Sequence, residues 1–130
     1  MRRLLAAVAL LGAVACGSGN NPTNPAYQPE IVNLTDSFSF QLTGVQNGAG
    51  SLPYTWQNTG TKATIDRSSS ISAGTVTLTL KDSAGATVYT GPLNGVSGSV
   101  QTAVGAAGAW TIIVGFSGAT GTINFRAQKL

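Results

Sequence analysis

The 130-residue sequence contains no histidine, and this absence excludes several kinds of chemistry. Serine–histidine nucleophilic catalysis, histidine-ligated metal binding and imidazole acid–base catalysis all need that side chain. The four carboxylates, Glu30, Asp36, Asp66 and Asp82, lie far apart, so none forms a short-range pair or an acidic calcium-binding loop. Asp66 and Asp82 are expected to be strand-end and turn residues. We therefore expect no catalytic residue, no metal, no cofactor and no enzyme activity.

Charged residues are also scarce, at 8% of the chain. After residue 15, five basic residues stand against four acidic ones, so the formal charge is five minus four, or +1. These charges are scattered, whereas a nucleic-acid-binding surface needs clustered basic residues beside aromatic side chains. We expect no nucleic-acid partner.

The first part of the sequence has the design of an export signal. Residues 1–15, MRRLLAAVALLGAVA, place Arg2 and Arg3 before an apolar run that ends in small residues. The apolar run is shorter than the about 20 residues that a membrane-spanning helix needs. We predict that residues 1–15 are a signal peptide that is removed during export.

Cys16 is the only cysteine in the chain, so it has no intramolecular disulfide partner. An unpaired thiol is reactive in an oxidising compartment, and attachment of a lipid would remove that reactivity. Cleavage can be interpreted in two ways. The triplet Ala13-Val14-Ala15 fits ordinary signal peptidase, which would release a secreted protein that begins at Cys16.

The same residues and the cysteine, A-V-A-C, resemble the lipobox of bacterial lipoproteins, with Ala13 where leucine is most common. The resemblance implies a diacylglycerol on the Cys16 thiol and an acylated amine, so that palmitate-type chains anchor the protein to the cell envelope. Two acyl chains hold a protein stably on a membrane, whereas one chain binds only marginally. Gly17 stands where an aspartate signals inner-membrane retention in Gram-negative lipoproteins. The resemblance therefore implies the outer membrane in such a host.

A segment without hydrophobic periodicity follows the cysteine. Residues 17–29, GSGNNPTNPAYQP, are rich in proline, glycine, serine and asparagine, and they bury too little apolar surface to offset their ordering entropy. A flexible coil of this length reaches about 20 Å. We predict a lipidated cysteine and disordered tether over residues 16–29, followed by a folded domain over residues 30–130.

Apolar and polar residues alternate from about residue 31 onward, which is typical of half-buried strands. Clear runs lie at 38–42, 76–80, 110–116 and 123–127, and weaker ones lie at 52–58, 61–66, 86–90 and 96–102. The segments between them are expected to form turns: GVQNGAG, SSSISAG, DSAG, GPLNG, GAAG and SGATG. The pattern predicts an all-β fold, an antiparallel β-sandwich of seven or eight strands with an Ig-like or jelly-roll-like arrangement. A closed barrel is the alternative.

The C-terminal half of the chain resembles bacterial pre-peptidase C-terminal domains and related β-sandwich modules of extracellular proteins. Such domains show an Asp-x-x-Gly turn, a strand that begins with glycine and an aromatic residue, and a glycine turn before the last strand. The residues in these places are Asp82, Gly85, Gly108, Trp110, Gly118 and Gly121. The resemblance implies an accessory or binding module, with an envelope protein or a glycan as its partner.

Tyr54 and Trp56 are the candidate ligand platform. They are two residues apart and share one face of an expected strand, beside polar residues such as Gln57. Exposed aromatic rings stack on sugar rings while amides bond the hydroxyls, so this pair would suit a surface carbohydrate-binding module. The alternative places both rings in the core, as expected for Trp110 among its apolar neighbours. The solvent exposure of Trp56 distinguishes the two interpretations.

Overall fold

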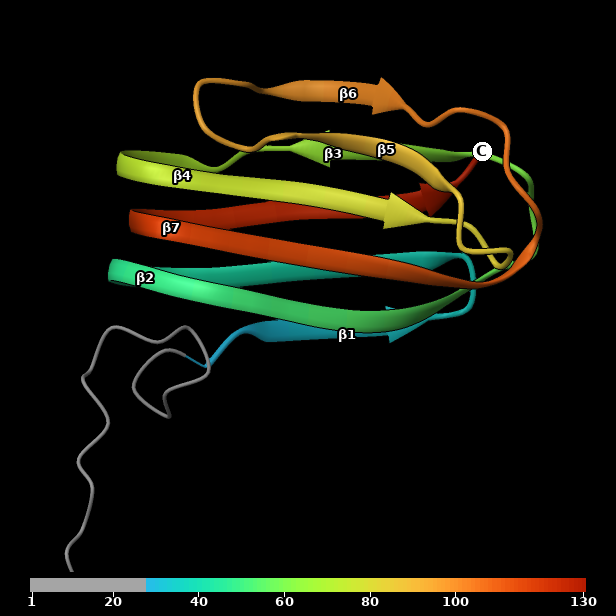
Figure 1. Cartoon of the computed structure of the whole chain (residues 1–130), viewed down its shortest axis with the longest axis horizontal. Helices are drawn as coiled ribbons and strands as arrows, with labels where there is room; N and C mark the ends of the chain where they lie inside the picture. The colour runs from blue at the N-terminus through green and yellow to red at the C-terminus, as the bar shows by residue number, and fades with distance from the viewer. Residues whose placement is uncertain (1–27) are drawn as a thin grey trace, which may run out of the picture.

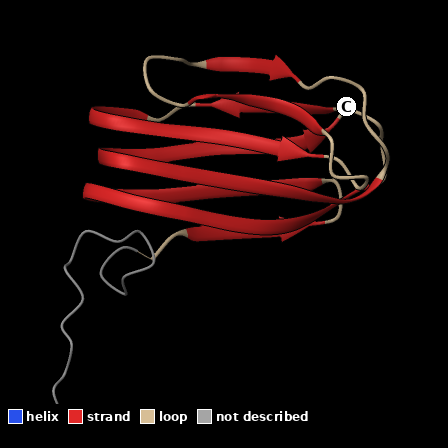
Figure 2. Ribbon diagram, viewed as in Figure 1, coloured by secondary structure: helices blue, strands red, loops and turns tan. Residues whose placement is uncertain are grey.

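The computed structural model describes residues 28–130 (Figure 1). The predicted signal peptide, Cys16 and most of the predicted tether lie outside these residues. Within them, strands and connecting loops make up the structure, and no helix is long and apolar enough to cross a membrane (Figure 2). The strands are β1 (Glu30–Leu34), β2 (Ser37–Asn58), β3 (Ala63–Arg67), β4 (Ser70–Lys81), β5 (Thr87–Pro92), β6 (Gly98–Gln101) and β7 (Gly108–Lys129).

The seven strands form one antiparallel sheet that folds over into two layers. One layer has the strand order β1-β2-β7-β3-β6 and uses residues 37–42 of β2 and 123–128 of β7. The other has the order β2-β7-β4-β5 and uses residues 50–58 of β2 and 108–116 of β7. The predicted antiparallel β-sandwich is confirmed. Its two layers are continuous, because β2 and β7 each contribute one part of their length to each layer.

The fold-over lies at one end of the molecule, where β2, β4 and β7 bend together (left in Figure 1). The turns predicted at GVQNGAG and SGATG are wrong, since the chain bends there but keeps strand pairing, with Val45 opposite Gly121 and Gly48 opposite Ala119. Register shifts interrupt the β2–β7 ladder between residues 42 and 49. Such irregularities bend a strand and increase its twist, which allows one strand to serve two layers.

The outcome for the other predicted turns is mixed. The DSAG segment joins β4 and β5 in a hairpin, as predicted, and the Gly85 N–H donates to the Asp82 carbonyl at 3.0 Å. The SSSISAG segment is not a turn throughout, because β4 already begins at Ser70 and pairs with β7. Its residues extend the sheet through the bend.

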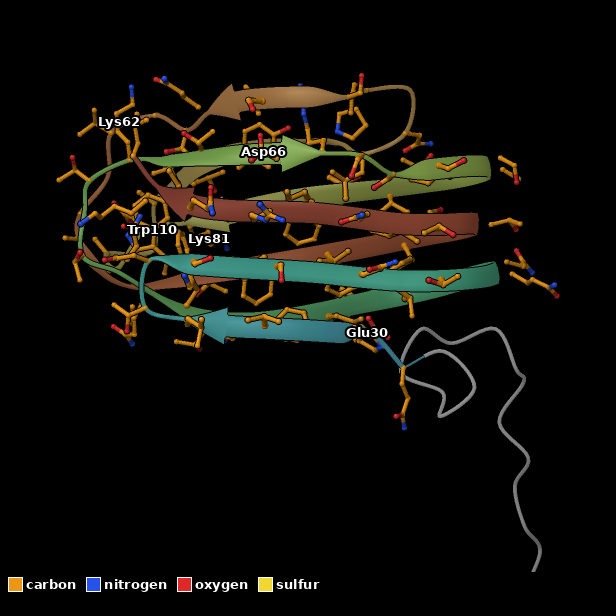
Figure 3. The ribbon with its side chains drawn as sticks, turned by 180° about the vertical axis from the view of Figure 1, so that it is seen from behind. Glu30, Lys62, Asp66, Lys81 and Trp110 are labelled. Atoms are coloured by element: carbon orange, nitrogen blue, oxygen red, sulfur yellow. The ribbon has the colours of Figure 1, made fainter. Side chains whose placement is uncertain are left out.

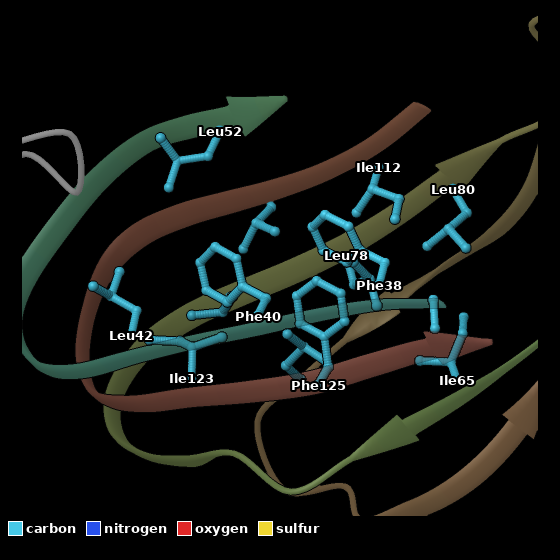
Figure 4. Close-up of a cluster of buried hydrophobic side chains, with 14 of the residues drawn as sticks. Phe38, Phe40, Leu42, Leu52, Ile65, Leu78, Leu80, Ile112, Ile123 and Phe125 are labelled. Atoms are coloured by element: carbon cyan, nitrogen blue, oxygen red, sulfur yellow. The ribbon is translucent and has the colours of Figure 1, made fainter. Parts of the chain in front are cut away.

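The core lies between the two layers and consists of the inward residues of the alternating runs (Figure 4). Phe40 stacks on Phe125 with ring centroids 5.3 Å apart, and Phe38 stacks on Phe125 at 5.9 Å. Burial of each such side chain contributes about 1.5–3 kcal/mol. The other layer supplies Val76, Leu78, Leu80, Ile112 and Val114, all fully buried.

Candidate functional site

Trp56 and Trp110 lie in the core as cross-strand partners, and both side chains are 0% exposed. Their rings meet edge to face, with centroids 5.9 Å apart. Each indole N–H is satisfied internally: Trp56 donates to the Leu34 carbonyl at 3.0 Å, and Trp110 donates to the Ala106 carbonyl at 2.8 Å. Trp56 therefore has no open face on which a sugar ring could stack, and the core interpretation holds for both tryptophans.

Tyr54 is half-buried at the margin of the same core. Its ring packs against Phe38 and Phe40, with centroid distances of 5.5 and 6.0 Å. Burial raises the pKa of the Tyr54 hydroxyl above its usual range. Tyr54 and Trp56 thus share a strand face, as predicted, but that face is turned inward and does not form an exposed platform.

Asp82 closes the turn between β4 and β5. Its Oδ1 accepts hydrogen bonds from the N–H groups of Ala84 and Ala86, at 3.0 and 2.8 Å, and its Oδ2 accepts one from Ala106 at 2.9 Å. These bonds, led by that from Ala106, lower the pKa of the Asp82 carboxyl, which is 7% exposed. The geometry makes Asp82 a turn residue, as expected.

Asp36 plays a similar part at the β1–β2 turn. Its carboxylate accepts hydrogen bonds from the Thr59 N–H at 2.8 Å and from the Thr59 hydroxyl, and Lys129 Nζ lies 3.5 Å from Oδ2. The Thr59 backbone bond is the main cause of its lowered pKa. Asp66 lies within β3, where the Ser99 hydroxyl donates to it. No group of three potential metal ligands occurs among residues 28–130.

The outer faces of the two layers differ in composition. The layer β2-β7-β4-β5 turns threonines outward, and we call its outer face the threonine face: Thr55, Thr75, Thr77, Thr79, Thr87, Thr90 and Thr111. The layer β1-β2-β7-β3-β6 turns amides and charged groups outward, and we call its outer face the amide face: Glu30, Gln41, Asp66, Gln101, Asn124, Arg126 and Gln128. Figure 3 views the molecule from the side of the amide face.

The strand register arranges the amide face in rows. Glu30, Gln41 and Asn124 lie side by side on β1, β2 and β7. The next row runs from Val32 across Ser39 to Arg126, and then to Asp66 on β3. Neighbours within a row are about 4.8 Å apart, so one ligand can touch several of them.

These two rows line a shallow depression of about 270 Å³. Its lining includes Glu30, Val32, Ser39, Gln41, Asn124 and Arg126. None of the polar side chains in this set makes a hydrogen bond or an ion pair to another residue of the described segment 28–130. The depression is the best candidate for a binding site in the described part of the chain, because it combines a hollow with polar groups available to a ligand.

This site was not predicted from the sequence. Alternation predicted that these residues face outward, but the register that brings Glu30 beside Gln41 and Asn124 comes from pairing between distant strands. One signal was present: the run at 123–127 carries Asn124 and Arg126 at its outward positions, where the run at 76–80 carries threonine. This contrast would have singled out the outward side of the last strand.

No family model and no curated protein matches the chain. A solved structure with some similarity is that of arabinose-bound MgGH51 α-L-arabinofuranosidase, at 18% sequence identity and a TM-score of 0.36. The match covers 79% of this chain but only 23% of that enzyme's chain. A TM-score this low carries no argument about fold or function.

Proposed function

We propose that this protein is a lipid-anchored lipoprotein of the bacterial cell envelope whose β-sandwich serves as a non-enzymatic interaction module. The observation that carries the proposal is A-V-A-C at residues 13–16, placed between an apolar run and a proline- and asparagine-rich segment. Cleavage before Cys16 leaves an N-terminal cysteine for acylation. The alternative, secretion after cleavage by ordinary signal peptidase, uses the same bond and differs only in the fate of the thiol.

The position of the domain supports this arrangement. The first strand begins at Glu30, so residues 17–29 separate the lipid from the sandwich by a reach of about 20 Å. Glu30 lies at the end of the molecule opposite Lys62 and Trp110 (Figure 3). A domain held in this way keeps its far end and both outer faces accessible to other envelope components. Gly17 in place of aspartate favours the outer membrane of a Gram-negative host.

The non-enzymatic part of the proposal rests on how the carboxylates are used. Asp36 and Asp82 are engaged by backbone N–H groups and close turns, and Asp66 bonds Ser99. Glu30 is the remaining carboxylate, and the chain has no histidine to act with it. These groups support a scaffold that presents surfaces better than one that performs acid–base chemistry.

Replacement of the cysteine tests the anchor. In bacterial cells that express the full chain, we expect Cys16→Ser to move the protein from the membrane fraction to the soluble fraction and to abolish labelling by a palmitate analogue. The matched control is Ser18→Ala, which alters a nearby residue of the tether and should remain labelled and membrane-bound. Unchanged membrane partitioning of Cys16→Ser, or an unlabelled and soluble parent chain, contradicts the proposal.

A further inference from the structure

We propose that the amide face binds a neutral saccharide chain, with the depression between β1, β2 and β7 as the main contact. The inference rests on the interaction-module half of the proposed function and not on the lipid anchor. It also differs from a site at Trp56, because the structure buries that ring.

The two outer faces of the sandwich carry different polar residues. Both faces must be polar, and threonine meets this need with a high strand propensity, as on the threonine face. Asparagine and glutamate are disfavoured in strands, yet Asn124 and Glu30 occupy outward strand positions on the amide face. The requirements of the fold do not explain this choice, whereas recognition of a ligand does.

The chemistry of the depression indicates the ligand class. The Gln41 and Asn124 amides both donate and accept hydrogen bonds, Glu30 accepts, and Arg126 donates. A sugar hydroxyl donates one hydrogen bond and accepts others, so it can be satisfied by this mixed set. The exposed Val32 side chain, 52% accessible, supplies methyl groups for the C–H surface of a sugar ring.

The charge balance argues against an anionic ligand. Glu30 and Arg126 leave the depression with no net formal charge, and Asp66 adds a negative charge in the same row as Arg126. A phosphate polymer or an anionic membrane surface requires several clustered basic residues. A neutral polyhydroxylated chain is the ligand that these groups complement, and the neighbouring rows offer further hydroxyl and amide contacts at Ser37 and Gln128.

Affinity electrophoresis of the full chain in detergent tests the proposal. The gels contain xylan, mannan or dextran as neutral probes, polygalacturonate or alginate as acidic probes, or no polymer. We expect slower migration in at least one neutral gel relative to the polymer-free gel. Asn124→Ala and Gln41→Ala should each weaken the apparent affinity about five- to tenfold, because each removes one or two hydrogen bonds to the ligand.

The controls are Thr55→Ala and Thr77→Ala on the threonine face, which should migrate like the parent chain. Thermal unfolding of all four variants shows that loss of binding is not loss of folding. The proposal is overturned by unchanged migration in every neutral gel, by retardation that survives Asn124→Ala and Gln41→Ala, or by retardation in the acidic gels alone. Membrane fractionation tests the lipid anchor separately, because Asn124→Ala should stay in the membrane fraction whether or not it binds a polymer.

Discussion

At the turn between β4 and β5, backbone N–H groups from two separate segments converge on the carboxylate of Asp82. Two come from the turn itself, and the third, from Ala106, belongs to the loop between β6 and β7. Hydrogen bonds to an ionised carboxylate are stronger than those between neutral groups. A single side chain therefore fastens a loop to a hairpin at the end of the sandwich opposite the fold-over (Figure 1).

This geometry predicts a pH dependence of stability. The pKa of Asp82 lies below its usual value of 3.8 in the folded protein, chiefly because of the Ala106 hydrogen bond. The pKa of Asp36 is also lowered, so this carboxylate changes the free energy of unfolding with pH in the same direction. Such carboxylates contribute their full stabilisation above the unfolded-state pKa and lose it as the pH falls through the folded-state pKa. We expect the free energy of unfolding to be nearly constant from pH 7 to about pH 5 and to decrease below about pH 4.

Asp82→Asn should be less stable than the parent chain at pH 7 and should lose less additional stability on acidification. Its amide retains one acceptor oxygen but turns a donor toward a backbone N–H. Urea denaturation at pH 7, 5, 4 and 3 measures both effects, with Thr77→Ala as a control without an ionisable group. An acid-induced loss in Asp82→Asn equal to that of the parent chain would show that Asp82 is not the linked carboxylate.

At the scale of elements, the bends in β2, β4 and β7 decide the architecture. At Gly74 φ is +71°, and a Cβ there would lie 2.1 Å from the Gly118 carbonyl oxygen. At Gly121 φ is +139°, and a Cβ would lie 2.1 Å from the Ser70 carbonyl oxygen. The strands can cross the fold-over in close contact only because these two positions have no side chain.

Alanine substitutions distinguish the energetic cost of a steric clash from the cost of a left-handed backbone conformation. Gly44 also has a left-handed conformation, with φ +70°, but nothing lies within 4 Å of its would-be Cβ. We expect Gly44→Ala to cost about 1–2 kcal/mol, the penalty of the left-handed region alone. Gly74→Ala and Gly121→Ala should each cost about 4 kcal/mol or more, or prevent folding, because a backbone must move. Urea denaturation compares the three, and equal losses would contradict the steric argument.

The same bends mark the limit of what the sequence could predict. Alternation located the inward residues correctly, as in Phe38 and Phe40 or Leu78 and Leu80, because a period of two follows directly from strand geometry. Glycine with positive φ suits a hairpin turn and a strand bend equally well, so GVQNGAG and SGATG were indistinguishable from turns. The amide face depends on the register of distant strands, and local pattern does not encode that register.

In the whole molecule, the edge strands β2 and β5 of one layer are partly covered, while both outer faces are open. On the outer edge of β2, the Thr55 carbonyl accepts from the Asn33 amide and the Gln57 carbonyl accepts from the Asp36 N–H, each at 2.8 Å. Backbone groups alternate along a strand, so Pro53 faces this same edge and offers no N–H. On β5 the Val88 carbonyl accepts from Ala103 at 2.9 Å.

The covered outer edge of β2 has a consequence for association. An uncovered edge strand is a template for pairing with another chain, and proline or covering side chains prevent this. These features keep a second copy of the chain from pairing with the outer edge of β2. We expect the outer edge of β2 to take no part in any self-association of the full chain.

The double variant Pro53→Thr with Asn33→Ala opens the outer edge of β2. It restores a backbone donor at residue 53 and releases the acceptor at Thr55, so two neighbouring ladder positions become available to a second copy. We expect sedimentation to show more self-association than in the parent chain, rising with concentration, whereas Thr55→Ala, which changes only an outward side chain of the same strand, should sediment like the parent chain. A double variant that sediments like the parent chain would show that β2 is protected by something other than these two residues.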